Sequence, residues 1–175
     1  MRKLPVAVLI LTIALGGCRW RRHARDERQA LTPTRAAVVQ EGVRAFARSV
    51  ADAVTKDGPS AWARYFQDTP QFFMVVNGQM AFPSGVAAIT AIPQVAKQIP
   101  QITLTWGDDL RVDPLTPDLA VFAAPYHESL VLADARHVES NGYFTSVVEL
   151  TPAGWKFRNA HWSEPLPQAP VAKVK

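Results

Sequence analysis

Residues 154–163, GWKFRNAHWS, form the stretch on which the expected fold depends. Successive side chains of a β-strand point to opposite faces, so every second residue lies on the same face. One face would hold Trp155, Phe157, Asn159, His161 and Ser163. Because this set begins with two large apolar side chains, we expect it to face the interior. His161 would then point inward, while Arg158 and Trp162 would lie on the outer face.

The sequence before this stretch predicts further strands and a hairpin. Residues 102–112 alternate between apolar and polar types, and residues 119–132 and 138–150 are rich in β-formers, so each is a predicted strand. The two prolines of residues 113–118 predict a turn, and Gly142 predicts an interruption of the strand that contains it. Earlier, Asn77-Gly78 between residues 71–76 and 79–82 is a strong two-residue hairpin signal.

Three helices are expected in the first hundred residues. Thr32 and Pro33 resemble a cap and a first helical residue, and Gly58 a stop. Between them, apolar residues recur at helical spacing: Val39, Val43, Phe46, Ala47, Val50 and Val54. A second helix is expected over Ser60–Gln67. A third would start at Ser84, and Pro93 should end or kink it.

This order of elements predicts an α+β fold, with three N-terminal helices packed on one face of a curved, mainly antiparallel sheet. Together with the wording FPSGVAAI at residues 82–89 and GWKFRNAHWS at residues 154–163, the order resembles the nuclear transport factor 2-like superfamily, and within it the SnoaL-like branch. The resemblance covers residues 36–165. It implies a cone-shaped pocket, which enzymes and ligand binders both use, and homodimers formed through the outer sheet face.

A small, mostly apolar ligand is the expected occupant of that pocket. The predicted ligand-binding residues are Phe73, Trp106, Tyr126, Glu128, Tyr143, Phe144, Asn159 and His161. Tyr126 and Glu128 share one face of their strand and His127 takes the other. Since that strand is apolar on both faces, either set could point inward.

His161 is the candidate catalytic residue, because an imidazole can accept or donate a proton near neutral pH. It would need a partner such as Tyr126, Glu128, Tyr143 or Asp108; without one it is a hydrogen-bonded core histidine. Ketosteroid isomerase, an enzyme of the superfamily, uses an aspartate base. The resemblance places that base on the first strand. Residues 69–81 contain no acidic residue and hold Met74 near that position, which argues against steroid-isomerase chemistry.

No cofactor, metal or nucleic acid is expected. The four histidines are scattered without ligand spacing, and no phosphate-binding glycine loop is present. The net charge of +4 is concentrated in residues 1–35, which hold eight basic and two acidic residues. The rest of the chain is therefore slightly acidic, whereas a nucleic-acid-binding domain needs a basic face.

The N-terminus predicts a lipid anchor. Residues 1–17 have a basic start and an apolar run, Leu4–Leu15, that is too short to span a bilayer, as in a secretory signal peptide. The sequence LGGC at residues 15–18 resembles a bacterial lipobox, which implies lipidation of Cys18. A plain signal peptide or a cytosolic chain are the alternatives. Residues 18–35 would be a basic tether, residues 36–165 the domain, and residues 166–175 a loose tail.

Three roles remain open from the sequence. In order of preference, they are a ligand-binding module, a dimeric interaction or structural protein, and an enzyme of isomerase, dehydratase or hydrolase type that uses His161. Each would operate in the cell envelope, with the anchor expected in the outer membrane and the domain facing the periplasm.

Overall fold

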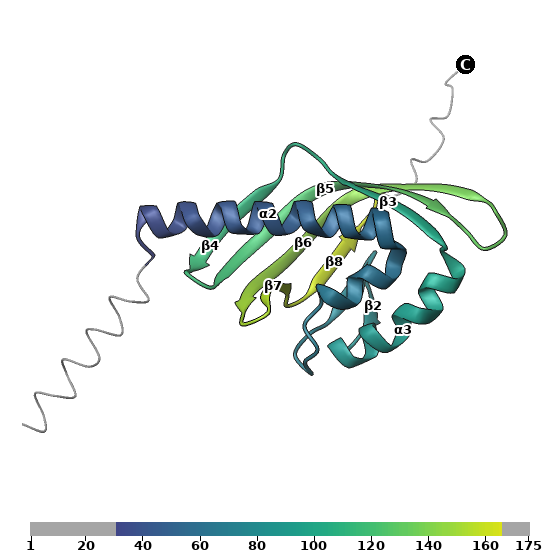
Figure 1. Ribbon diagram of the computed structural model, residues 1–175, viewed down its shortest axis with the longest axis horizontal. Helices are drawn as coiled ribbons and strands as arrows, with labels where there is room; N and C mark the ends of the chain where they lie inside the picture. The colour runs from purple at the N-terminus through teal and green to yellow at the C-terminus, as the bar shows by residue number, and fades with distance from the viewer. Residues whose placement is uncertain (1–30, 166–175) are drawn as a thin grey trace, which may run out of the picture.

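The computed structural model describes residues 31–165, so Cys18, the expected signal peptide, most of the expected tether and the expected tail lie outside the described residues (Figure 1). The described helical segments are α2 (Pro33–Asp57), the 3₁₀ helix η1 (Gly58–Arg64) and α3 (Gly85–Gln98). The strands are β1 (Met74–Val76), β2 (Gln79–Phe82), β3 (Gln101–Trp106), β4 (Arg111–Thr116), β5 (Leu119–Val131), β6 (His137–Thr151), β7 (Gly154–Phe157) and β8 (Ala160–Ser163).

The α+β class is as predicted, but the expected set of three helices is not. Within the described residues there are two α-helices, and the segment expected as a second helix, Ser60–Gln67, is covered mostly by the 3₁₀ helix η1. Pro93 does not end α3, which continues to Gln98. Pro93 is exposed, and the helix continues past it without the hydrogen bond that a proline cannot donate to the Ile89 carbonyl.

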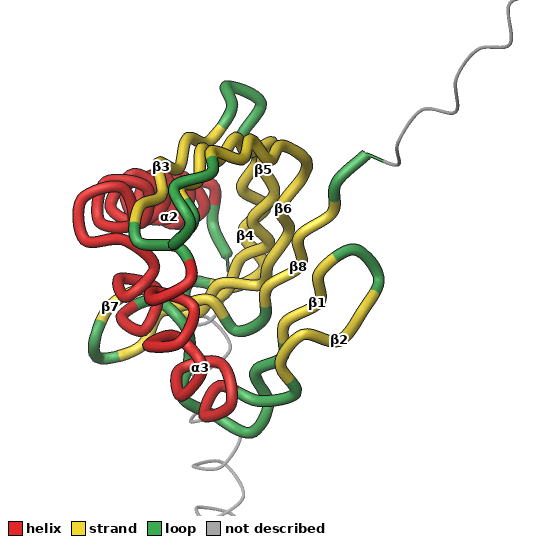
Figure 2. Tube along the Cα trace, turned by 90° about the vertical axis from the view of Figure 1, so that its right-hand side faces the viewer, coloured by secondary structure: helices red, strands yellow, loops and turns green. Residues whose placement is uncertain are grey.

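Helix α2 forms as its sequence predicts. The Thr32 hydroxyl accepts a hydrogen bond from the Arg35 amide at 3.3 Å, and Pro33 opens the helix. All six apolar residues at the predicted spacing are buried, and Gly58 follows the last residue with φ of +71°. Residues of α2 thus form the helical side of the core, against the sheet (Figure 2).

The sheet is mixed, with the order β2-β1-β8-β6-β5-β3. Strands β1 and β8 run parallel and the other pairs are antiparallel. The long strand β5 pairs with β3 through one half and with β4 through the other. The predicted strand 102–112 is therefore two strands, and β4 extends to Thr116, through most of the predicted turn.

The β1–β2 hairpin confirms the Asn77-Gly78 signal. Both residues have positive φ, +50° and +79°, which a type I′ turn requires at its two central positions. This hairpin lies at one edge of the sheet and beside β8, which carries the end of the GWKFRNAHWS stretch (Figure 2).

The GWKFRNAHWS stretch is broken at Arg158-Asn159 into β7 and β8. The Asn159 side-chain oxygen accepts a hydrogen bond from the Val147 amide at 2.7 Å, and its backbone carbonyl accepts one from the Ser146 hydroxyl at 2.6 Å. These bonds hold an irregular pair of residues against β6, so the alternation restarts at Ala160. The predicted orientation is correct for Phe157 and wrong from Ala160 onward.

Candidate ligand-binding site

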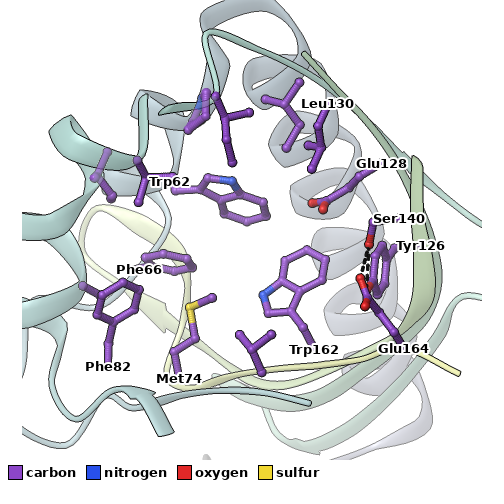
Figure 3. Close-up of a pocket in the computed structure, with 17 residues that line it drawn as sticks. Trp62, Phe66, Met74, Phe82, Tyr126, Glu128, Leu130, Ser140, Trp162 and Glu164 are labelled. Atoms are coloured by element: carbon purple, nitrogen blue, oxygen red, sulfur yellow. Dashed lines mark hydrogen bonds between the residues drawn. The ribbon is translucent and has the colours of Figure 1, made fainter. Parts of the chain in front are cut away.

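A cavity of about 240 Å³ lies between the sheet and the helices η1 and α3. Most of its wall is apolar, and at one end four side chains present oxygen atoms (Figure 3). The apolar wall includes Trp62, Phe66, Met74, Val76, Phe82, Ile92, Leu130 and Trp162. The polar end is formed by Tyr126, Glu128, Ser140 and Glu164.

Trp162 forms the part of the wall that joins the two ends of the cavity. Its ring contacts Tyr126 edge-on, with centroids 4.7 Å apart, and Trp62 edge-on at 5.7 Å. The Phe144 ring lies 4.5 Å away, centroid to centroid, on the core side. These contacts hold the Trp162 side chain in place from several sides, so this part of the cavity wall is rigid.

A chain of hydrogen bonds orders the polar end. The Tyr126 and Ser140 hydroxyls lie 3.4 Å apart, and the Ser140 hydroxyl donates to the Glu164 carboxylate at 2.5 Å. The Asn77 side-chain amide donates to the other carboxylate oxygen at 3.2 Å and accepts from the Glu164 backbone amide at 2.8 Å. The turn of the β1–β2 hairpin therefore holds Glu164 at the cavity.

Gly142 makes this arrangement possible. A Cβ atom at this position would lie 1.9 Å from the Ser163 carbonyl oxygen, so only glycine allows the end of β8 to approach β6 so closely. The close approach places Glu164 beside Ser140, two residues before Gly142. The predicted interruption is wrong: β6 continues through Gly142, and the glycine serves a backbone contact instead.

The Glu128 carboxyl group points into the cavity (Figure 3). Burial, and next the negative charge of Glu164, raise its pKa from 4.5 to about 7. Within residues 31–165, no hydrogen bond or ion pair engages its side chain. A half-buried carboxyl group with such a pKa exists in both forms at neutral pH, so it can bind a cation, donate a hydrogen bond, or exchange a proton with a bound molecule.

The structure brings together two of the predicted site residues and separates the others from the cavity. Tyr126 and Glu128 point into it, which decides the orientation that the sequence left open, and His127 is on the opposite face, where it pairs with Glu139 at 3.1 Å. Trp106 and Phe144 lie behind Trp162 in the core. Phe73 and Tyr143 are exposed.

His161 is not at the cavity. It lies on the sheet face opposite Trp162, and its Nδ1 is 3.3 Å from the Thr145 hydroxyl. The expected inward orientation is wrong because the Arg158-Asn159 irregularity shifts the alternation by one residue. Asn159 is engaged with β6, and Asp108 is exposed in the loop after β3. The geometry thus separates His161 from Tyr126 and Glu128.

The outer face also differs from the one expected for a dimer. Trp162 is 7% exposed and belongs to the interior, whereas Arg158 is on the surface and pairs with Glu149 at 3.0 Å. Dimerisation through this face stays a prediction, to be decided by the mass of the protein in solution.

Metal clusters and membrane-spanning helices are absent from the described residues. Among residues 31–165, no three His, Cys, Asp or Glu side chains are grouped so that they could hold a metal ion. No helix in this part of the chain is long and apolar enough to cross a membrane.

Comparisons with known proteins identify the class of fold. No protein-family model matches the chain, and no curated protein does. Solved structures do match. A nuclear transport factor 2-like superfamily protein of Salmonella enterica serovar Typhimurium is 17% identical, with a TM-score of 0.61 over 83% of this chain and 100% of that one.

Two further structures carry names of enzymes. A candidate scytalone dehydratase of Novosphingobium aromaticivorans has a TM-score of 0.66 at 10% identity, over 82% of this chain and 100% of its own. A hexachlorocyclohexane dehydrochlorinase has a TM-score of 0.62 at 12% identity, over 82% and 98%. The chain has the nuclear transport factor 2-like fold, as its sequence predicted; identities this low establish the fold alone.

Proposed function

We propose that this protein binds a small, mostly apolar molecule in the cavity, with the polar group of the ligand at Glu128. The observation that carries the proposal is an apolar cavity with one carboxyl group that no protein group within residues 31–165 satisfies. Protein interiors are close-packed, so an apolar cavity of this size with a half-buried, unpartnered carboxyl group in its wall is unusual. Ligand sites combine apolar walls with a few convergent polar groups, which is the composition found here.

The size of the cavity limits the ligand. An engineered apolar cavity of about 150 Å³ holds benzene, so about 240 Å³ suits a molecule of roughly ten non-hydrogen atoms, or one part of a longer molecule. We also propose that this cavity is the cone-shaped pocket that the resemblance to the superfamily implies.

A variant that fills the cavity tests the proposal. Val76 lines the cavity from β1, and Val75 next to it does not. We expect 3-phenylpropanol to bind the unmodified protein with a dissociation constant on the order of 1 mM, and Val76→Phe to weaken this binding at least about tenfold. Isothermal titration calorimetry measures both constants. Val75→Phe is the matched control, and an equal loss of binding in this variant would place the ligand elsewhere.

We also propose that Cys18 is lipidated and anchors the protein to the outer membrane, with the domain in the periplasm. The proposal is supported by the LGGC sequence at residues 15–18 after a short apolar run. Cys18→Ser should prevent incorporation of radiolabelled palmitate and move the protein from the membrane fraction to the soluble fraction. Unchanged labelling would rule out this anchor.

A further inference from the structure

The cavity has charge of one sign only. Of the described residues that line it, Glu128 and Glu164 are acidic, and none is lysine, arginine or histidine. Both carboxyl groups belong to the same end, where the Tyr126 and Ser140 hydroxyls also lie (Figure 3). Low-dielectric walls strengthen the field of such groups inside a cavity. The polar end therefore attracts a positive charge and repels a negative one.

Aromatic rings surround the route between the polar and apolar ends. Trp162 packs edge-on against both Trp62 and Tyr126, and all three line the cavity. The faces of aromatic rings, of tryptophan above all, attract cations through their electron density. A ring face turned to the bound molecule would favour a cation independently of the carboxyl groups and would offer nothing to an anion.

We propose that the ligand of this cavity is an organic cation: an amine whose ammonium group lies between Glu128 and Glu164 and whose apolar body lies against Trp62, Phe66 and Met74. The inference rests on the proposed function, because it names the class of molecule that the same cavity accepts. It excludes anionic amphiphiles such as fatty acids, which would place another carboxylate beside the two already there.

The partners of the two carboxyl groups differ in a way that suits this ligand. Glu164 already accepts hydrogen bonds from Ser140 and Asn77, so its charge is stabilised by the protein. Glu128 is faced by the charge of Glu164 and by the Tyr126 hydroxyl, and the elements η1, β1 and α3 contribute apolar residues only. An ammonium group would supply the positive partner that Glu128 lacks among the described residues.

This arrangement makes binding dependent on pH. Without a ligand, the pKa of Glu128 is about 7, so its carboxyl group is mainly neutral at pH 5 and mainly ionised at pH 8. A primary amine with a pKa like that of lysine stays protonated over this range. The preference for an amine should therefore increase from pH 5 to pH 8, and binding at pH 7 should release protons to the buffer.

Three compounds with the same carbon skeleton and different charge test the inference on the full-length protein. They are 3-phenylpropylamine, 3-phenylpropanol and 3-phenylpropanoate. At pH 8 we expect the amine to bind roughly tenfold more tightly than the alcohol, since charge-assisted hydrogen bonds are about twice as strong as neutral ones, and the carboxylate to bind most weakly. Calorimetry in two buffers of different ionisation enthalpy measures affinity and proton release together.

Two variants locate the effect. In Glu128→Gln, the ratio of amine to alcohol affinity should fall at least about threefold, with Glu164 left as the one remaining carboxylate at the polar end, whereas Glu139→Gln, which removes a carboxylate from the opposite sheet face, should keep the ratio. If the alcohol binds as tightly as the amine at pH 8, the cation inference is wrong and the proposed function stands. If none of the three compounds binds, both are wrong.

Discussion

Replacing Trp162 by alanine is expected to lower the free energy of unfolding by about 3–5 kcal/mol, the usual cost of removing a large aromatic side chain from a core. Trp162 is 7% exposed. Its ring contacts four others, with centroid distances of 4.5 Å to Phe144, 4.7 Å to Tyr126, 5.7 Å to Trp62 and 6.1 Å to Trp106. The change would leave a void that joins the existing cavity, and the surrounding rings would lose contacts on one side.

His161→Ala is the matched control, because it changes the neighbouring residue of the same strand on the other face. His161→Ala should lower the free energy of unfolding by less than about 1 kcal/mol, since the side chain is half-buried and has one hydrogen-bond contact, to Thr145. Urea unfolding followed by circular dichroism measures both variants. A larger loss of unfolding free energy in His161→Ala than in Trp162→Ala would mean that β8 has the orientation predicted from the sequence and that Trp162 does not line the cavity.

The second large effect concerns Glu128 and pH. Its pKa is raised from 4.5 to about 7 in the folded protein, so the folded state binds this proton more tightly than the unfolded chain does. The stabilisation is therefore fully present below pH 4.5 and is lost as the pH rises through about 7. A tenfold difference in proton affinity between the folded and unfolded states corresponds to about 1.4 kcal/mol, and partial solvent access limits the whole contribution to about 2–3 kcal/mol.

Glu128→Gln isolates this contribution, because the amide has nearly the same shape and does not ionise. We expect the variant to equal the unmodified protein at pH 5 within about 1 kcal/mol and to exceed its stability by about 2–3 kcal/mol at pH 8. Urea titrations at both pH values give the four free energies. An equal difference at pH 5 and pH 8 would mean that Glu128 has an ordinary pKa and that the polar end of the cavity is well hydrated.

Local signals in the sequence predict the parts of the fold that local physics decides. The cap at Thr32, the buried spacing along α2 and the Asn77-Gly78 turn each depend on a few neighbouring residues, and each is confirmed. Gly142 shows the limit of such reasoning. Its local sequence predicts a break in its own strand, whereas the glycine is required by a backbone twenty-one residues later in the chain, at Ser163.

The predicted orientation of Ala160–Ser163 is wrong for a related reason. Strict alternation holds only while pairing is regular, and the irregularity at Arg158-Asn159 is fixed by Ser146 and Val147 on another strand. Because this irregularity shifts the alternation by one residue, Trp162 points inward in place of His161.

The two residues of the polar end that sequence reasoning missed, Ser140 and Glu164, differ in how far they could be predicted. Ser140 could have been found, because the β5–β6 hairpin pairs it with Glu128. Glu164 could not have been found, because Gly142 and Asn77 position it. Nothing in the sequence near either of these two residues points to Glu164. Contacts between distant segments thus decide the polar end of the cavity.

The most direct test of the central claim is the indole N–H region of a ¹⁵N NMR spectrum, recorded with and without 3-phenylpropanol. Trp62 and Trp162 line the cavity, whereas Trp155 lies on β7 outside it. We predict that the signals of Trp62 and Trp162 shift together and saturably while that of Trp155 does not move. Unchanged signals of Trp62 and Trp162 at saturating compound, or a shift confined to Trp155, would contradict the claim that this cavity binds a ligand.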